Sequence, residues 1–417
     1  METVVRDLRL ILGVQALRAF VYGLGSVLIG SSLAAAGVSE VEAGLVFSAM
    51  LVGLAVSSVA VGLAGDRIGR RRAYAGLLAV MGVAGTVYAL TDHPALLVAA
   101  ALTGTLSTDP NESGPITSLE QAMIGEVPHR ARARVFGRYN AVAYVAGAVG
   151  ALAAGGPAAL RDVLPSLPPA QRWLLAFPPV AAACVGLASR LSGAVEGRGA
   201  SPAGPGGRTT PLGASRSMVL RLAGLFGLDA FAGGFVVQTF LVFWFRRRFG
   251  ATPELMGAVF FGAGLLQAAS SVAAGRLGGR IGLLETMVFT HLPSNVLLAL
   301  VPLAPSLGAA IAILLARFAL SQMDVPARQA YVVALVEPPE RTAAAAFTNT
   351  ARSVARPVGP AAAGLLMQHL AVGAPFVVAG ALKVVYDLVL YATFRRVPIE
   401  AARVEGGPGG RPGPSRT

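Results

Sequence analysis

The sequence is short of charged residues, which make up 13% of its 417 positions, whereas apolar residues make up 54%. A water-soluble protein of this size needs far more polar side chains to cover its core. The chain has one cysteine, Cys184, so an intrachain disulfide is excluded, and it has no Cys and His cluster with metal-ligand spacing. It also lacks the HExxH and GxSxG patterns of hydrolases. We therefore predict a membrane protein that is not an enzyme and holds neither a metal nor a cofactor.

The apolar residues are gathered in runs long enough to cross a bilayer, which needs roughly 20 helical residues. Residues 43–64 and 73–91, for example, contain no charged side chain. The same criterion, applied along the whole chain, predicts twelve transmembrane helices. Their expected ranges are 10–36, 43–64, 73–91, 95–124, 135–159, 172–190, 218–244, 255–275, 284–304, 307–335, 342–367 and 374–394.

Basic residues exceed acidic residues by 34 to 21, which gives a formal net charge of +13 at pH 7. The arginines lie in short loops between the predicted spans and are not interleaved with aromatic residues, so we do not expect nucleic-acid binding. Lys and Arg accumulate on the cytoplasmic side of membranes. Most of them fall in the loops on the side that also carries both chain ends. We therefore predict a multi-pass protein of the cytoplasmic membrane with both termini in the cytoplasm.

The spans form two groups of six, and short segments recur in both groups at nearly one offset. The "RIG" at 67–69 returns at 280–282, and "LRAF" at 17–20 returns as "LDAF" at 228–231. Such repeats are typical of duplicated transporters. A stretch rich in Gly, Pro and Ser separates the groups and is expected to be a flexible linker. The predicted parts are an N-terminal six-helix bundle at 1–190, a cytoplasmic linker at 191–217, a C-terminal six-helix bundle at 218–396 and a disordered cytoplasmic tail at 397–417.

The loop between the second and third spans reads GLAGDRIGRRR over residues 62–72. A Gly, an acid four residues later, a basic residue, a Gly and further basic residues are similar to the loop signature of the major facilitator superfamily. The chain resembles this family over nearly its whole length, although Ala64 replaces the usual leucine. The resemblance implies an all-α membrane protein with twelve transmembrane helices in two pseudo-symmetric six-helix bundles. The residues that match the signature are Gly62, Asp66, Arg67, Gly69, Arg70 and Arg71.

The resemblance also implies that this loop acts as a latch for the outward-open state. Asp66 would pair with a loop arginine such as Arg130 and with the positive end of the eleventh span. Gly65 and Gly69 would permit a tight turn. A solvated turn that only sets the topology is the alternative.

Ionised side chains are costly at membrane depth, so they usually line a wet cavity or pair with one another. In the proteins that this chain resembles, spans 1, 4, 7 and 10 enclose the central cavity, and most of the intramembrane charge lies on these spans. The residues predicted to bind substrate or protons in the cavity are Arg18, Asp109, Glu112, Asp229, Arg317 and Asp324.

The repeat relates acids in one half to bases in the other. The corresponding positions are Arg18 and Asp229, Glu120 and Arg328, and Asp109 and Arg317. We predict that Arg18 and Asp229 lie on opposite walls of the cavity, with static pairing as the alternative. Glu120 and Arg328 are predicted to act as gating residues across the seam between the halves, or else to be ordinary residues of its inner rim.

The remaining intramembrane charges have simpler interpretations. Lys383 lies one helical turn before Asp387 and is predicted to neutralise it within the helix. His291 is expected to make a structural polar contact. Arg352 and Arg356 are expected to anchor their span to other helices or to lipid headgroups.

Spans 4 and 10 are expected to be interrupted, because "STDPNESGP" at 107–115 and "SQMDVPARQ" at 321–329 place prolines at membrane depth. Irregular backbone is tolerated there only where it faces protein or water. Paired interruptions in corresponding spans point to a transporter's binding site. Asp109 or Glu112, together with Asp229 and Asp324, would carry the coupling proton.

These features predict a secondary active transporter that moves a small organic solute by alternating access, with proton-coupled efflux as the expected mode. The glycine-rich segment at 147–157 partly resembles the glycine motif of family exporters, although close helix packing explains it equally well. The alternative is a proton-coupled importer of an organic anion drawn by the intramembrane arginines. The expected partners are a small-molecule substrate, protons and the lipid bilayer, and the protein is expected to be a monomer.

Overall fold

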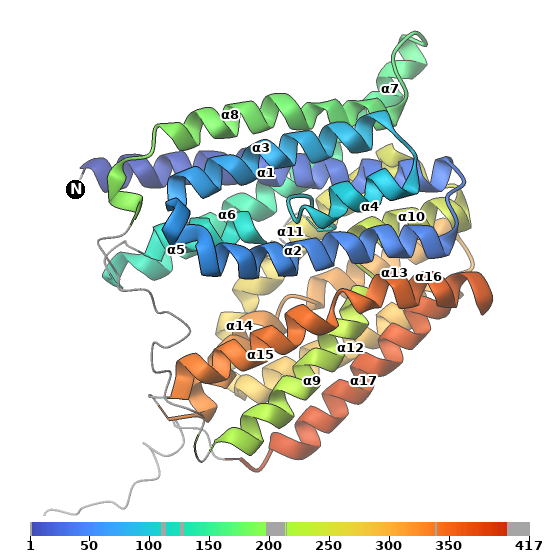
Figure 1. Cartoon of the computed structure of the whole chain (residues 1–417). Coiled ribbons are helices and arrows are strands. Elements are labelled where there is room, and N and C mark those ends of the chain that lie inside the picture. The colour runs from blue at the N-terminus through green and yellow to red at the C-terminus, as the bar shows by residue number, and fades with distance from the viewer. Residues whose placement is uncertain are drawn as a thin grey trace, which may run out of the picture.

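The computed structural model describes residues 2–109, 114–125, 129–196, 213, 215–337 and 340–397. The regular secondary structure in these ranges is entirely helical. Eight helical segments there are long and apolar enough to cross a membrane. Figure 1 shows the helices as two bundles, one from each half of the chain. Most of the predicted linker and nearly all of the predicted tail lie outside the described residues, so the four domain boundaries stay predictions.

Helices of the first half cover the first six predicted spans, and those of the second half cover the other six. The first half contains α1 (Glu2–Ala35), α2 (Glu40–Ile68), α3 (Arg70–Leu90), α4 (Pro94–Leu102), α5 (Pro115–Gly125), α6 (His129–Ala153), α7 (Gly156–Val163), the 3-10 segment η1 (Ala170–Ala176), α8 (Phe177–Ser189) and η2 (Gly193–Glu196). The second half contains α9 (Arg216–Gly234), α10 (Gln238–Phe249), α11 (Pro253–Ile281), α12 (Leu283–Leu300), η3 (Val301–Leu303), α13 (Leu307–Leu320), α14 (Asp324–Leu335), α15 (Arg341–Ala355), α16 (Val358–His369) and α17 (Ala374–Phe394).

Local sequence signals explain where several of these helices begin. Ser39 accepts a hydrogen bond from the backbone N–H of Glu42, and the Glu42 carboxylate accepts one from the backbone N–H of Ser39. This reciprocal capping satisfies two N–H groups that have no partner within α2. Helix α11 begins with Pro253 after Thr252, whose side chain accepts from the backbone N–H of Leu255.

The predicted interruptions in spans 4 and 10 are confirmed. Helix α4 ends at Leu102 and α5 begins at Pro115, whereas α13 ends at Leu320 and α14 begins at Asp324. Two further spans are also divided, span 7 between α9 and α10 and span 11 between α15 and α16. Four spans therefore carry irregular backbone at membrane depth, where it must face protein or water.

We call the end of the bundles at which α8 ends and α9 begins the linker end, and the opposite end the distal end. The halves meet towards the distal end, through α1 with α10, α2 with α16 and α6 with α11 (Figure 1). Hydrogen bonds also join them there, for example from the backbone N–H of Ala361 to Oγ of Ser48 at 2.9 Å. Within the described ranges, no hydrogen bond joins the two halves at the linker end.

The close approach of the halves depends on small residues. A Cβ atom on Gly44 of α2 would lie 2.5 Å from the carbonyl oxygen of Pro360, in the first turn of α16. A Cβ on Gly30 of α1 would overlap the carbonyl oxygen of Thr239 in α10. Because any larger residue would separate the backbones, these glycines allow tight van der Waals packing between the halves.

Glycines of span 5 serve packing inside the first half. A Cβ atom on Gly150 of α6 would overlap the backbone of Phe20 in α1, and one on Gly23 would overlap the carbonyl oxygen of Gly147. This contact supports the packing interpretation of the glycine-rich segment at 147–157.

Gly44→Ala is expected to loosen the distal contact, because the added methyl group has no space beside Pro360. A cysteine introduced by Ser48→Cys should be labelled faster by a thiol reagent in the Gly44→Ala protein than in the protein that keeps Gly44. The native buried Cys184 serves as the internal standard for the labelling rate. Gly76→Ala is the matched control, since a Cβ there meets nothing within 4 Å. It should leave the rate unchanged and stabilise α3 by up to about 1 kcal/mol. Equal labelling rates in both variants would contradict this packing role.

Candidate substrate and proton site

A buried ion pair lies inside the first half. Nη2 of Arg18 on α1 is 2.6 Å from Oε2 of Glu120 on α5. The hydroxyl of Tyr74 donates to Oε1 of Glu120 at 2.7 Å, and the hydroxyl of Tyr139 donates to Oε2. The guanidinium of Arg18 also lies 5.3 Å from the ring centroid of Tyr22. Arg18 is 2% exposed and Glu120 is fully buried, so each charge is satisfied by its own half of the protein.

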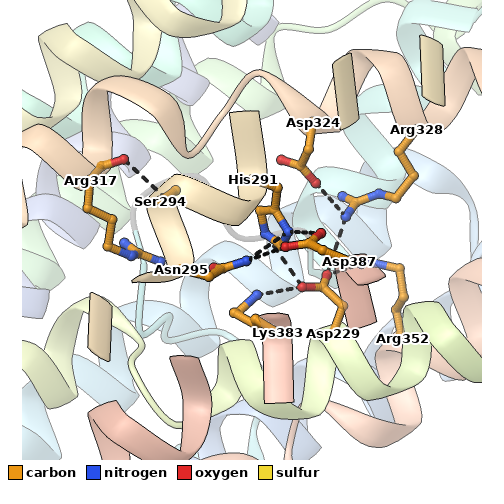
Figure 2. Close-up of polar contacts among 10 residues, drawn as sticks. All are labelled: Asp229, His291, Ser294, Asn295, Arg317, Asp324, Arg328, Arg352, Lys383 and Asp387. Atoms are coloured by element: carbon orange, nitrogen blue, oxygen red, sulfur yellow. Dashed lines mark hydrogen bonds and ion pairs between the residues drawn. The ribbon is translucent and has the colours of Figure 1, made fainter. Parts of the chain in front are cut away.

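A second cluster, within the second half, is centred on Asp229 of α9. Its carboxylate contacts Nζ of Lys383 on α17 at 2.5 Å, Arg352 on α15 at 2.8 Å and Arg328 on α14 at 3.4 Å. Arg328 also pairs with Asp324, one turn earlier on α14, at 3.0 Å. Figure 2 shows these side chains converging on Asp229 from several helices. A single buried carboxylate thus ties α9, α14, α15 and α17 together.

His291 of α12 connects this cluster to a second buried acid. Its Nδ1 is 2.8 Å from Oδ1 of Asp387 on α17, and its Nε2 is 3.7 Å from Oδ1 of Asp229 (Figure 2). Nδ2 of Asn295 donates to Oδ2 of Asp387 at 2.9 Å. His291 thus makes the expected polar contact and bridges two carboxylates.

The prediction that Arg18 and Asp229 face each other across a cavity is wrong. Each is buried against partners in its own half, as is each member of the predicted gate formed by Glu120 and Arg328. The physical reason is that a buried charge left without its partner costs about 3–5 kcal/mol, which every separation of the halves would incur. The ion pairs of the two halves occupy corresponding positions of the repeat. Arg18 on α1 is the base in the first half, and Asp229 on α9, its counterpart, is the acid in the second half.

The predicted pairing of Lys383 with Asp387 inside α17 is also wrong. Lys383 reaches across to Asp229, and Asp387 binds His291 and Asn295 instead. The anchoring of span 11 to another helix is confirmed for Arg352, because it binds Asp229 of α9.

Asp109 is the predicted cavity residue that joins the two halves. Its Oδ2 lies 2.8 Å from Nη2 of Arg356, at the junction of α15 and α16, and its Oδ1 accepts from the backbone N–H of Gln238 at 2.9 Å. The two side chains of the ion pair are 27% and 30% exposed. Because they are open to water, this pair can break at far lower cost than the buried pairs within each half.

Arg317, on the last turn of α13, differs from the other intramembrane arginines. Its guanidinium forms no ion pair or hydrogen bond with any residue in the described ranges, and its buried Nε has no partner. It lies 5.1 Å from the ring centroid of Phe318. The nearby acids that act on its charge are Asp109, Asp229 and Asp324. Arg317 therefore lies between the central cluster and the other half with its donors available.

The loop after α2 turns at Gly69, whose φ of 92° favours glycine. The carboxylate of Glu196 accepts from the backbone N–H groups of Arg70 at 2.6 Å and Arg71 at 3.3 Å, so an acid does cap the N-terminus of α3. Sequence reasoning missed Glu196, which is distant in the chain.

Arg67 lines a groove of about 550 Å³ at the linker end. The side chains of Asp66 and Arg130, which form the predicted latch, lie outside the described part of the chain, as does the predicted cavity residue Glu112. A Cβ atom on Gly62 would meet nothing within 4 Å.

Comparison with known proteins shows the family. The model of the Major Facilitator Superfamily matches residues 11–245 and 222–415. A curated relative, the uncharacterized membrane protein YJR124C of Saccharomyces cerevisiae, is 27% identical over 424 residues and covers 93% of this chain and 94% of its own length. The chain belongs to the major facilitator superfamily, which consists of transporters and not enzymes.

Solved structures share the fold at low sequence identity. A bacterial homologue of the human lysosomal transporter Spinster, inward-facing and occupied, has 15% identity and a TM-score of 0.71, with 93% of this chain and 96% of that chain covered. The nucleoside transporter NupG has 11% identity and a TM-score of 0.74, with 93% and 99% covered. The xylose transporter XylE from E. coli, inward open, has 16% identity and a TM-score of 0.67, with 94% and 97% covered. The predicted fold of two six-helix bundles is confirmed.

Removing one member of the buried pair in the first half is expected to cost more than removing both. Arg18→Met leaves Glu120 charged and buried, so the free energy of unfolding should fall by about 3–5 kcal/mol. The double variant Arg18→Met/Glu120→Leu leaves no bare charge and should regain a large part of that loss. Unfolding titrations of both single variants and the double variant measure this. A double-variant loss equal to the sum of the single losses would rule out the coupling.

Proposed function

We propose that this protein is a secondary transporter of a small organic solute that works by alternating access and couples solute efflux to proton movement. The observation that carries the proposal is the distribution of charge contacts. The buried ion pairs around Glu120 and Asp229 each lie within one half, and the contacts between the halves lie towards one end. Two such units can rock about a central site without exposing a bare buried charge.

The linker end is proposed to be cytoplasmic, because Lys and Arg favour that side of a membrane. The halves touch towards the opposite end, so with this orientation the proposed state is inward-facing, and the proposed location is the cytoplasmic membrane. Asp109 and Arg356 would then form part of the closed outer side of the site. Two of the similar structures are inward-facing or inward-open, which supports this proposal.

The residues proposed for the central site are fewer than the sequence predicts. Asp109, Asp229, Arg317 and Asp324 remain. Asp109 binds Arg356 of the other half, Asp229 and Asp324 share Arg328, and Arg317 has no ion pair in the described ranges. Arg18 is removed, because its dry pair with Glu120 is structural. Glu112 and the latch of Asp66 with Arg130 remain proposals from the sequence, as do the Gly62 loop and the monomeric state. The outward direction is proposed from the partial likeness of residues 147–157 to the glycine motif of exporters.

Proteoliposomes with an internal pH indicator test the coupling. Addition of a transported solute from a panel of organic cations, anions and neutral compounds should move protons in vesicles that contain the protein. Asp229→Asn should abolish this movement, because it removes the carboxylate that three cations share. Asp92→Asn, an exposed acid outside the site, should retain it. Solute flux without proton movement, or normal coupling in Asp229→Asn, would refute proton coupling at this site.

Import of an organic anion is the second candidate, and the unpaired guanidinium of Arg317 favours it. An arginine at membrane depth lowers its cost by binding an anion. Arg317→Gln should then abolish the transport of anionic solutes and spare neutral ones. Arg172→Gln, which alters an exposed arginine outside the site, should change neither. Normal anion flux in Arg317→Gln would exclude this function, and the sign of the solute gradient in energised vesicles separates import from efflux.

A further inference from the structure

The acid Asp387 has an unusual set of partners. It is 0% exposed, and within the described ranges no Lys or Arg forms an ion pair with it. Its carboxylate receives only His291 at 2.8 Å and the amide of Asn295 at 2.9 Å. Asp229, by contrast, has three cations within 3.4 Å. A buried carboxylate without a cation is costly, so the charge on Asp387 has to be met by a proton on the pair it forms with His291.

We propose that His291 and Asp387 together form a proton-binding site, in which the bound proton competes with Lys383 for Asp387. The proposal deepens the proton coupling proposed above and rests on it. With the proton bound, His291 and Asp387 share it across the 2.8 Å contact between Nδ1 and Oδ1, and Lys383 binds Asp229 as the structure shows. When the proton leaves to water, His291 becomes neutral and Asp387 needs another cation.

Lys383 is that cation, because it lies four residues before Asp387 on α17, a spacing that places two side chains on one helix face. Its transfer from Asp229 to Asp387 leaves Asp229 with Arg328 and Arg352. The bonds that change are those to the proton, which leaves nitrogen or oxygen of the pair and binds to a water oxygen. One proton passes between water and the pair, and one ammonium group moves between two carboxylates.

The other charged and titratable groups around His291 set the direction of the response. They are Asp229 from α9, Asp324 and Arg328 from α14, Arg352 from α15, Arg317 from α13, and Lys383 and Tyr386 from α17. The three acids Asp229, Asp324 and Asp387 equal Arg328, Arg352 and Lys383 in number. Arg317 adds one positive charge to the group, and protonated His291 adds another. Arg352 is the most exposed of the basic residues that bind Asp229, with 25% of its side chain accessible. Arg352 keeps its contact with Asp229 in the protonated state that the structure shows, and it gains a larger share of that carboxylate when Lys383 leaves.

This arrangement would couple protonation to the seam. Arg352 lies one turn before Arg356, which binds Asp109 of the other half. A firmer hold of Arg352 on Asp229 after the proton leaves would fix the part of span 11 that carries the contact between the halves. The proton site would then control the span that closes the distal end.

Histidine side-chain NMR of the full-length protein in nanodiscs, without solute, tests the proposal. The sequence has four histidines, so His291→Gln assigns the signal and His369→Gln, at an exposed position, is the matched control. We expect the His291 imidazole to bind one proton reversibly. Asp387→Asn should move the midpoint to lower pH, since the counter-charge is lost. Lys383→Met should move it to higher pH by about one unit, or tenfold in proton affinity, since the competitor is lost.

A His291 signal that keeps its midpoint in both Asp387→Asn and Lys383→Met would overturn the proposal. Asp387→Asn keeps the shape of the side chain, so it remains informative if His291→Gln fails to fold. The measurement needs no transport. Coupled transport with an unresponsive His291 would refute this site alone, whereas a responsive His291 without any solute-linked proton movement would refute the proposed function.

Discussion

The cost of an ionised side chain in hydrocarbon is the constraint on which this structure depends. Both halves carry charge at membrane depth, and each keeps its buried ion pairs within itself. In the first half, Glu120 pairs with Arg18 and accepts hydrogen bonds from two tyrosine hydroxyls. In the second half, a larger network surrounds Asp229, and the signs at the two corresponding repeat positions are reversed. Arg317 of the second half is the exception, since its guanidinium has no ion pair in the described ranges.

The seam between the halves is built differently from their interiors. Small residues bring backbones into contact, as Gly44 does beside Pro360. The ion pair that crosses the seam near the centre, between Asp109 and Arg356, is more than a quarter exposed on both sides. Water can replace each partner in such a pair at little cost. Contacts that have to break during a transport cycle are therefore weak and wet, and contacts that hold a bundle together are buried and strong.

The sequence predicts the spans, the repeat and the two proline-interrupted helices, because length, apolar composition and proline act locally. It places Arg18, Glu120, Asp229 and Arg328 at corresponding depths but does not reveal their partners. Depth alone allows a pair across the seam or within a bundle. The sequence did contain a signal for pairing within each bundle. The base–acid pair of Arg18 and Glu120 corresponds to the acid–base pair of Asp229 and Arg328, so each half is neutral at these two positions.

Other contacts of the site depend on rotations and distances that no spacing rule contains. Lys383 is within one turn of Asp387, yet it extends to Asp229, and Asp387 binds His291 from α12. Glu196 caps α3 from a segment more than a hundred residues later in the chain. Both contacts follow from how helices pack, and helix packing is the step that patterns within one segment cannot predict.

The central claim is that the halves move as internally neutralised units. Distance measurements between pairs of spin labels test this claim most directly. One pair lies on α2 and α16, across the seam at the distal end, and the other lies on α1 and α5, within the first half. On addition of a transported solute, the distance across the seam should change and the distance within the half should not. A change between α1 and α5 as large as the change across the seam would contradict the account.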